Sequence, residues 1–179
     1  MDDVGPTLAL VHTGDDPCPR DLAGSTMNLP DDFRDMLLAL ADASASFVVI
    51  GGYAVAFHGH PRATKDIDVF VATGVAEAAR IERALAEFGA PLHALGVSRE
   101  DFEKPGRTVQ IGLAPLRIDV ITEVDGIDFA DAWASRVEMD LEGRVIPVIG
   151  RDALIRNKRA TARLQDLADI EALERMSDG

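Results

Sequence analysis

Apolar residues recur at two different spacings along the chain, and each spacing predicts a different kind of element. In residues 30–42 they recur at every third or fourth position, which predicts an amphipathic helix. Asp31 and Asp32 suit its first turn, because the amino end of a helix favours negative charge. The unbroken apolar run 47–50 follows and predicts a short buried strand.

A second strand is expected at residues 64–71, where polar and apolar residues alternate. Successive side chains of a strand point to opposite faces, so Asp66 and Asp68 share one face while Ile67 and Val69 share the other. This strand therefore buries its apolar face in a core and carries two neighbouring carboxylates on the other.

Further elements follow from the same two spacings. Residues 109–113 and 116–120 alternate on either side of Ala114-Pro115, which predicts a hairpin with Asp119 facing away from its apolar residues. Ser98 and Asp101 have the spacing of a helix cap. The other expected elements are a helix from 73–74 to Gly89, a short helix at 129–135, a strand at 145–149, and a helix at 151–175 that packs through Leu164, Leu167, Ile170 and Leu173.

This order of elements predicts an α+β fold with a mixed β-sheet flanked by helices. Three parts are expected along the 179 residues: a flexible N-terminal segment at 1–29, a main domain at 30–150, and a C-terminal helical segment at 151–179 packed on it. Within the first part, Leu8-Ala9-Leu10-Val11 is the one stretch with the character of a strand.

Composition narrows the class of protein. No apolar run reaches the length of a membrane span, and the single cysteine, Cys18, excludes an internal disulfide, so a cytoplasmic protein is expected. The formal charge of −13 argues against general nucleic-acid binding, which needs clustered basic residues. One basic cleft on an acidic protein remains compatible with the sequence, lined by Arg62, Lys65, Lys158, Arg159 and Arg163.

The aspartates on one strand face predict a metal site. Adjacent carboxylates repel one another, and a divalent cation between them relieves that repulsion. Gly51-Gly52 end the preceding strand, and their bare backbone amides can approach a phosphate. A solvated strand face for the aspartates and a plain tight turn for the glycines are the alternatives.

Three features in this order resemble the nucleotidyltransferase superfamily, whose best-known member is DNA polymerase beta. They are Gly51-Gly52, the pair Asp66-x-Asp68 after an interval of 13 residues, and Asp119 in a later strand. The stretch from His60 to Asp68 resembles more narrowly the AbiEii-type branch, often the toxin half of a toxin–antitoxin pair. The resemblance covers roughly residues 47–173.

The resemblance implies roles for the three carboxylates. Asp66 and Asp68 would hold the Mg²⁺ bound to the nucleotide and share the catalytic ion. Asp119 would bind the catalytic ion and help to deprotonate an acceptor hydroxyl. Two Mg²⁺ or Mn²⁺ ions and an NTP substrate are therefore expected. A salt bridge between Asp119 and Arg117 is the alternative reading of that aspartate.

The resemblance also implies a nucleotide-binding set. Much of the superfamily has Gly-Ser where this chain has Gly-Gly, so one hydroxyl contact to phosphate is missing. In the C-terminal region the AbiEii-like pattern has a Lys and then an Asp, and a Lys there can hold a γ-phosphate as a point charge. The alternative is a solvated helix face with an ion pair between Arg163 and Asp166. The expected set is Gly51, Gly52, Arg62, Thr64, Lys65, Lys158 and Asp166.

His58 and His60 suggest zinc at first sight, but no Cys or His partner stands at ligand spacing elsewhere. Anchoring of a loop is the expected role of these histidines.

The expected activity is metal-dependent transfer of an NMP from an NTP to a hydroxyl of a protein, a tRNA or a small molecule. A toxin–antitoxin system, with a cognate partner protein, is an expected context. The alternative is a nucleotidyltransferase-fold toxin, antitoxin or partner-binding module with little or no turnover.

Overall fold

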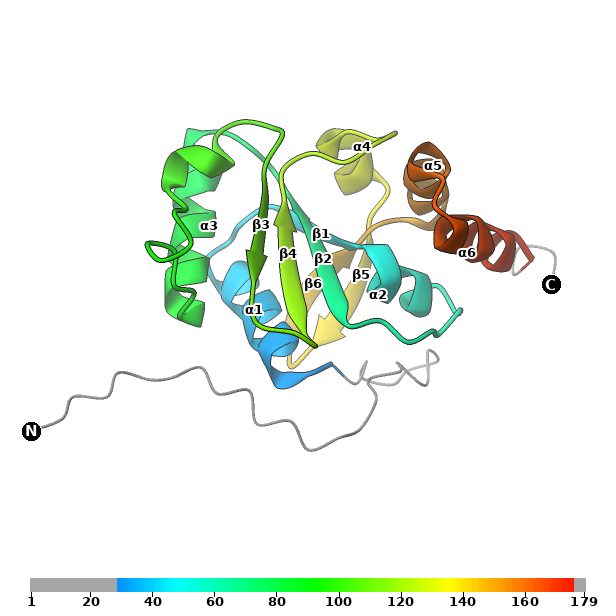
Figure 1. The fold of residues 1–179 in the computed structure, drawn as a ribbon, viewed down its shortest axis with the longest axis horizontal. Coiled ribbons are helices and arrows are strands. Elements are labelled where there is room, and N and C mark those ends of the chain that lie inside the picture. The colour runs from blue at the N-terminus through cyan, green and yellow to red at the C-terminus, as the bar shows by residue number, and fades with distance from the viewer. Residues whose placement is uncertain (1–28, 176–179) are drawn as a thin grey trace, which may run out of the picture.

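The computed structural model describes residues 29–175 of the chain (Figure 1). The N-terminal segment up to residue 28, with Cys18 and the expected strand at Leu8–Val11, lies outside the described residues.

A single mixed sheet of six strands organises the fold, in the spatial order β3-β4-β2-β1-β6-β5. β2 runs antiparallel to β1 and parallel to β4, and β1 runs parallel to β6. Antiparallel hairpins, β3–β4 and β5–β6, form the two edges. The strands are β1 (Phe47–Ile50), β2 (Asp66–Val71), β3 (Thr108–Ile111), β4 (Arg117–Ile121), β5 (Val137–Leu141) and β6 (Arg144–Val148).

Helices cover both faces of this sheet, which confirms the expected α+β class. α1 and α3 pack against each other on one face. α4 lies on the other, where Phe129 makes an edge contact with Phe70 of β2 at 5.3 Å between ring centroids. The helices are α1 (Asp31–Asp42), α2 (Gly51–Phe57), α3 (Val75–Phe88), α4 (Phe129–Ala134), α5 (Arg151–Thr161) and α6 (Leu164–Arg175), with a 3₁₀ turn, η1, at Arg99–Phe102.

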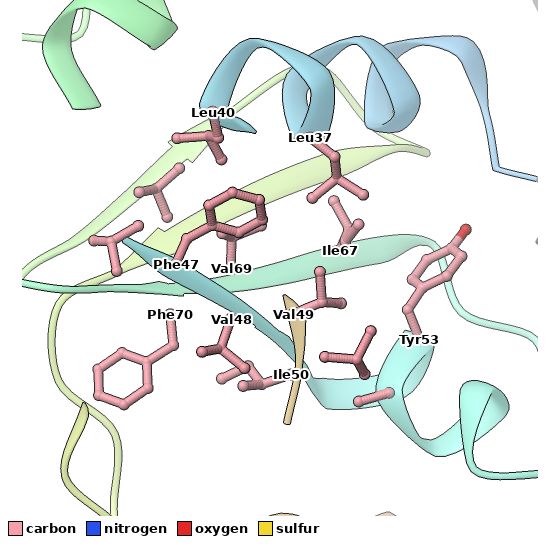
Figure 2. Close-up of a cluster of buried hydrophobic side chains, with 14 of the residues drawn as sticks. Leu37, Leu40, Phe47, Val48, Val49, Ile50, Tyr53, Ile67, Val69 and Phe70 are labelled. Carbon is pink, nitrogen blue, oxygen red and sulfur yellow. The ribbon is translucent and has the colours of Figure 1, made fainter. Parts of the chain in front are cut away.

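One part of the core lies between α1 and the centre of the sheet. Figure 2 shows Leu37 and Leu40 of α1 on the same side of the sheet as Phe47 and Val69, all of them almost completely buried. Burying each such side chain stabilises the fold by roughly 1.5–3 kcal/mol. Because alternate residues of β2 point to this core, the aspartates between them face the opposite side.

Two expectations about the C-terminal third were wrong. β5 was missed, although apolar residues at 137, 139 and 141 alternate with acidic ones, and it forms a hairpin with β6. The helix expected at 151–175 is two helices, because Ala162 adopts a left-handed conformation with φ of +49°. After this break Ile170 and Leu173 are buried as expected, but Leu164 and Leu167 are exposed.

None of the helices within residues 29–175 combines the length and the apolar character needed to cross a membrane.

Candidate active site

The parallel pairing of β2 and β4 brings together carboxylates that lie far apart in the sequence. Asp68 stands directly opposite Asp119, and Asp66 stands opposite Arg117. Arg117 donates two hydrogen bonds to Asp66, from Nε at 3.1 Å and from Nη2 at 3.0 Å. The alternative reading of Asp119, a salt bridge with Arg117, is therefore wrong. The register of β2 and β4 sets Arg117 opposite Asp66, and its guanidinium pairs with that carboxylate. Asp119 keeps one buried oxygen, Oδ1, that no described residue hydrogen-bonds.

The electrostatics of Asp68 and Asp119 favour a cation between them. Burial, the facing Asp119 carboxylate and then Asp66 raise the pKa of Asp68 to about 7. Burial and the charge of Asp66 also raise the pKa of Asp119 above its usual range. The surroundings of both carboxylates thus disfavour their ionised form. A divalent cation bound between them would stabilise the ionised form.

The pair Asp68 and Asp119 fits a site for one divalent metal ion. The expected site with all three carboxylates fits less well. Within residues 29–175, no group of three or more His, Cys, Asp and Glu side chains is arranged to hold a metal ion. Asp66 is engaged by Arg117, whereas Asp68 and Asp119 lie opposite each other with one oxygen unpartnered. Carboxylate oxygens are the ligands that Mg²⁺ prefers, so this pair matches the chemistry of such an ion.

Gly51 and Gly52 bring the backbone close to these groups. Gly51 follows β1 with φ of +66°, and a Cβ at this position would lie 1.9 Å from Oδ2 of Asp68. A Cβ on Gly52 would lie 2.8 Å from Oγ1 of Thr64 and 3.2 Å from Nη2 of Arg62. No larger residue fits at Gly51 while Asp68 keeps its place, so the close approach itself requires glycine.

A cavity of about 280 Å³ opens beside Asp68. It lies on the face of the sheet opposite α1, between the glycine turn, the end of β4 and the junction of α5 and α6. Its lining is mostly polar and carries both charges. The lining residues are Ile50, Gly51, Gly52, Arg62, Asp68, Thr108, Ile121, Glu123, Val124, Asp125, Asn157, Lys158, Thr161, Arg163 and Asp166.

Two of the cavity's cations are already paired with buried carboxylates. Lys158 Nζ lies 2.9 Å from Asp166 Oδ1 and 2.7 Å from Asp169 Oδ2. Arg62 donates two hydrogen bonds to Asp169, from Nε at 2.9 Å and from Nη2 at 3.1 Å. The Asp169 side chain is completely buried. Because it binds both Arg62 and Lys158, it links the segment before β2 to α5 and α6.

The pKa values of the two aspartates follow from this pairing. Burial alone would raise the pKa of Asp166 and Asp169, but the hydrogen bonds that they accept outweigh it. The bonds from Lys158 and Thr161 lower the pKa of Asp166, and those from Lys158, Gln165 and Arg62 lower that of Asp169. Both therefore stay ionised and balance the two cations. The alternative of a solvated helix face at Lys158 is wrong, because Lys158 is buried.

The other expected residues divide between the cavity and its surroundings. Thr64 does not line it; its hydroxyl donates to the carbonyl oxygen of Asp66 at 3.1 Å and supports the turn before β2. Lys65 is exposed and also lies outside the lining. His58 donates from Nε2 to the carbonyl oxygen of Ile149 at 2.7 Å, which agrees with the expected anchoring role.

Several residues of the site were missed by sequence reasoning. Glu123 and Asp125 follow β4 directly, so their position after the strand of Asp119 was an available signal. Asn157 donates to the carbonyl oxygen of Asp125 at 2.8 Å and holds this segment to α5. Arg163 was expected in a basic cleft and does line the cavity. It meets the site together with Asp169 only because the C-terminal helix breaks at residue 162, for which the sequence shows no glycine or proline.

A family model described as "Nucleotidyl transferase AbiEii toxin, Type IV TA system" matches residues 35–177, which include every charged group described above. A comparison with curated proteins finds no match.

Two solved structures share the fold. The lincosamide antibiotic adenylyltransferase LnuA, in a lincomycin-bound crystal structure, is 14% identical with a TM-score of 0.53, covering 82% of this chain and 96% of that one. The antibiotic-resistance factor ANT(2'')-Ia, solved in solution, is 16% identical with a TM-score of 0.53, covering 83% of each chain. At these identities the likeness extends to the fold alone.

Proposed function

The chain belongs to the AbiEii nucleotidyltransferase family, and from this premise we propose that it transfers an NMP from an NTP to a hydroxyl group in a metal-dependent reaction. The observation that supports this most is the pair Asp68 and Asp119, opposed on neighbouring strands, with Asp68 lining a polar cavity. In nucleotidyl transfer a protein mainly positions charge, and this pair is placed to do that.

We propose that Asp68 and Asp119 hold at least one Mg²⁺ or Mn²⁺ ion. Such an ion would supply positive charge to the reacting phosphate and its oxygens. Asp119, whose Oδ1 lacks a partner and whose pKa is raised, is the group placed to accept a proton from an acceptor hydroxyl. Asp66 would join a second ion only when its pair with Arg117 opens, so two ions remain a proposal.

Gly51 and Gly52 line the cavity beside Asp68. We propose that their backbone amides receive phosphate oxygens. The acceptor is proposed as a hydroxyl of a protein, a tRNA or a small molecule. The net charge of −13 and the lining residues Glu123 and Asp125 disfavour the tRNA among these. A cognate partner protein in a toxin–antitoxin system is the proposed setting, because the family model carries that description.

Two features favour a second function, a partner-binding module with little turnover. Arg117 occupies Asp66 through two hydrogen bonds, and Gly52 stands where much of the superfamily has a serine hydroxyl. Both features would weaken catalysis without disturbing the fold.

The test combines binding with transfer. Each of the four NTPs, labelled at the α-phosphate, is incubated with the protein, Mg²⁺ and cell lysate, and label is followed into protein, RNA and small molecules. Affinity for the same NTPs is measured by calorimetry for wild type, Asp68→Ala and Asp119→Ala. We expect both variants to lose transfer, with the larger loss of NTP affinity in Asp68→Ala, since Asp68 lines the cavity. A wild type that binds NTP and labels nothing would support the binding module.

A further inference from the structure

Three cationic side chains line the cavity, Arg62, Lys158 and Arg163, and their surroundings differ. The first two are neutralised by carboxylates within the fold, as described above. The side chain of Lys158 is 5% exposed and that of Arg62 is 23% exposed, so neither reaches freely into solvent. A phosphate that recruited either one would have to break a buried ion pair, which is strongly unfavourable.

Arg163 differs from both in burial and in contacts. It is exposed, and no described residue forms a hydrogen bond or an ion pair with its guanidinium. Its backbone N–H donates to Oδ2 of Asp166 at 3.2 Å, and this bond fixes the main chain at the junction of α5 and α6. The guanidinium is therefore available while its attachment point is held.

Arg163 also lies within electrostatic range of Asp68. Its positive charge, after that of Lys158, is one of the influences that hold down the pKa of Asp68. Arg163 and Asp68 thus face the same cavity, one as an available cation and the other as a candidate metal ligand. A polyphosphate chain needs both kinds of group, a metal at one end and a cationic side chain along its length.

We propose that Arg163 is the side chain that binds the polyphosphate of the nucleotide, while Lys158 and Arg62 are positioning residues that hold the cavity wall in place. The inference rests on the proposed nucleotidyl transfer and gives the phosphate contact to Arg163 in place of Lys158 and Arg62. The guanidinium suits the task, because its planar donors pair with two phosphate oxygens at once. Asp166 and Asp169 serve this arrangement by keeping Lys158 and Arg62 neutralised.

The experiment measures binding of inorganic tripolyphosphate, the four NTPs and the matching NMPs by calorimetry, with Mg²⁺ at physiological salt. Arg163→Gln removes the charge at nearly constant length. Arg159→Gln is the matched control, since Arg159 is an exposed arginine on α5 that pairs with Glu174 and does not line the cavity. Both variants change the net charge equally, and neither removes a buried contact.

We expect Arg163→Gln to weaken tripolyphosphate and NTP binding about 10-fold or more, as loss of a charge-assisted hydrogen bond implies. Binding of NMP, and all binding by Arg159→Gln, should stay within about twofold of wild type, because exposed charges contribute little at this salt concentration. Equal weakening by the two variants, or an Arg163→Gln protein that binds tripolyphosphate like wild type, would overturn the inference.

These binding data, taken together with the transfer assay described above, separate this inference from the proposed function. A wild type that binds tripolyphosphate in an Arg163-dependent way but transfers no nucleotide would support the phosphate contact and overturn the transfer. A wild type that binds neither tripolyphosphate nor any NTP would overturn both.

Discussion

Replacing Asp68 with Asn should stabilise the metal-free protein, and the gain should grow with pH. The folded state raises the pKa of this carboxyl to about 7 from an ordinary value near 3.8. Between these two values the unfolded chain releases the proton while the folded protein keeps it, so the free energy of unfolding falls as pH rises. Asn carries no charge and avoids this loss. No described residue hydrogen-bonds the Asp68 carboxylate, so the substitution removes no bond.

The size of the effect follows from the same pKa. A carboxyl with a pKa near 7 in the fold corresponds to an upper limit of about 4 kcal/mol at alkaline pH. Asp68 is only partly buried, and solvent screening reduces this to roughly 2 kcal/mol. For a chain of this size, that predicts a Tm higher by about 4–8 °C at pH 8 and unchanged at pH 4.

Thermal unfolding in EDTA from pH 4 to pH 8 measures the effect for wild type, Asp68→Asn and Glu138→Gln, an exposed control on β5. Adding Mg²⁺ at pH 8 should then raise the Tm of wild type and leave that of Asp68→Asn nearly unchanged, because ligand linkage requires the site. A Tm difference that is the same at pH 4 and pH 8, or an Asn variant less stable at pH 8, would refute the reasoning.

Three further predictions concern the backbone and the buried charges. Gly51→Ala should abolish NTP binding in calorimetry and lower the Tm more than Gly89→Ala, because both have positive φ but only Gly51 has Asp68 within clashing distance; equal Tm losses would contradict the clash. Ala162→Gly should stabilise the protein by about 0.5–1 kcal/mol in urea unfolding, since glycine adopts the left-handed conformation without strain, and a lower midpoint would contradict this. Asp169→Asn should destabilise the fold by about 3–5 kcal/mol in the same assay, as it removes the carboxylate that pairs with Arg62 and one of the two that hold Lys158, and a loss below 1 kcal/mol would show that the pairs matter little.

The sequence predicts the sheet face of Asp66 and Asp68 and the turn at Gly51, because both depend on local rules. Alternation decides which way a strand residue points, and a glycine between strand and helix marks a turn. The mixed sheet follows from the order of helices and strands in the same way. These features needed no knowledge of distant contacts.

The ion-pair partners of the charged residues could not be predicted, because they depend on the register between strands. Arg117 is two residues from Asp119 in sequence, yet it pairs with Asp66, since the parallel alignment of β2 and β4 sets it there. The burial of Lys158 likewise depends on the break at Ala162, which folds Asp166 back onto it. Periodicity alone describes a continuous helix and cannot locate that break.

The pairing of β1 with β6 has a consequence for synthesis of the chain. β1 joins β2 within one short segment, but Val49 finds its partner Val148 only after most of the chain has been made. Until then β1 is an apolar strand with an open edge, and such edges favour aggregation. The helix that carries Lys158 follows β6, so the cavity wall is the last part to be supplied. A chain truncated before residue 148 therefore lacks α5 and α6, and with them the cavity wall that Asn157, Lys158 and Asp166 form.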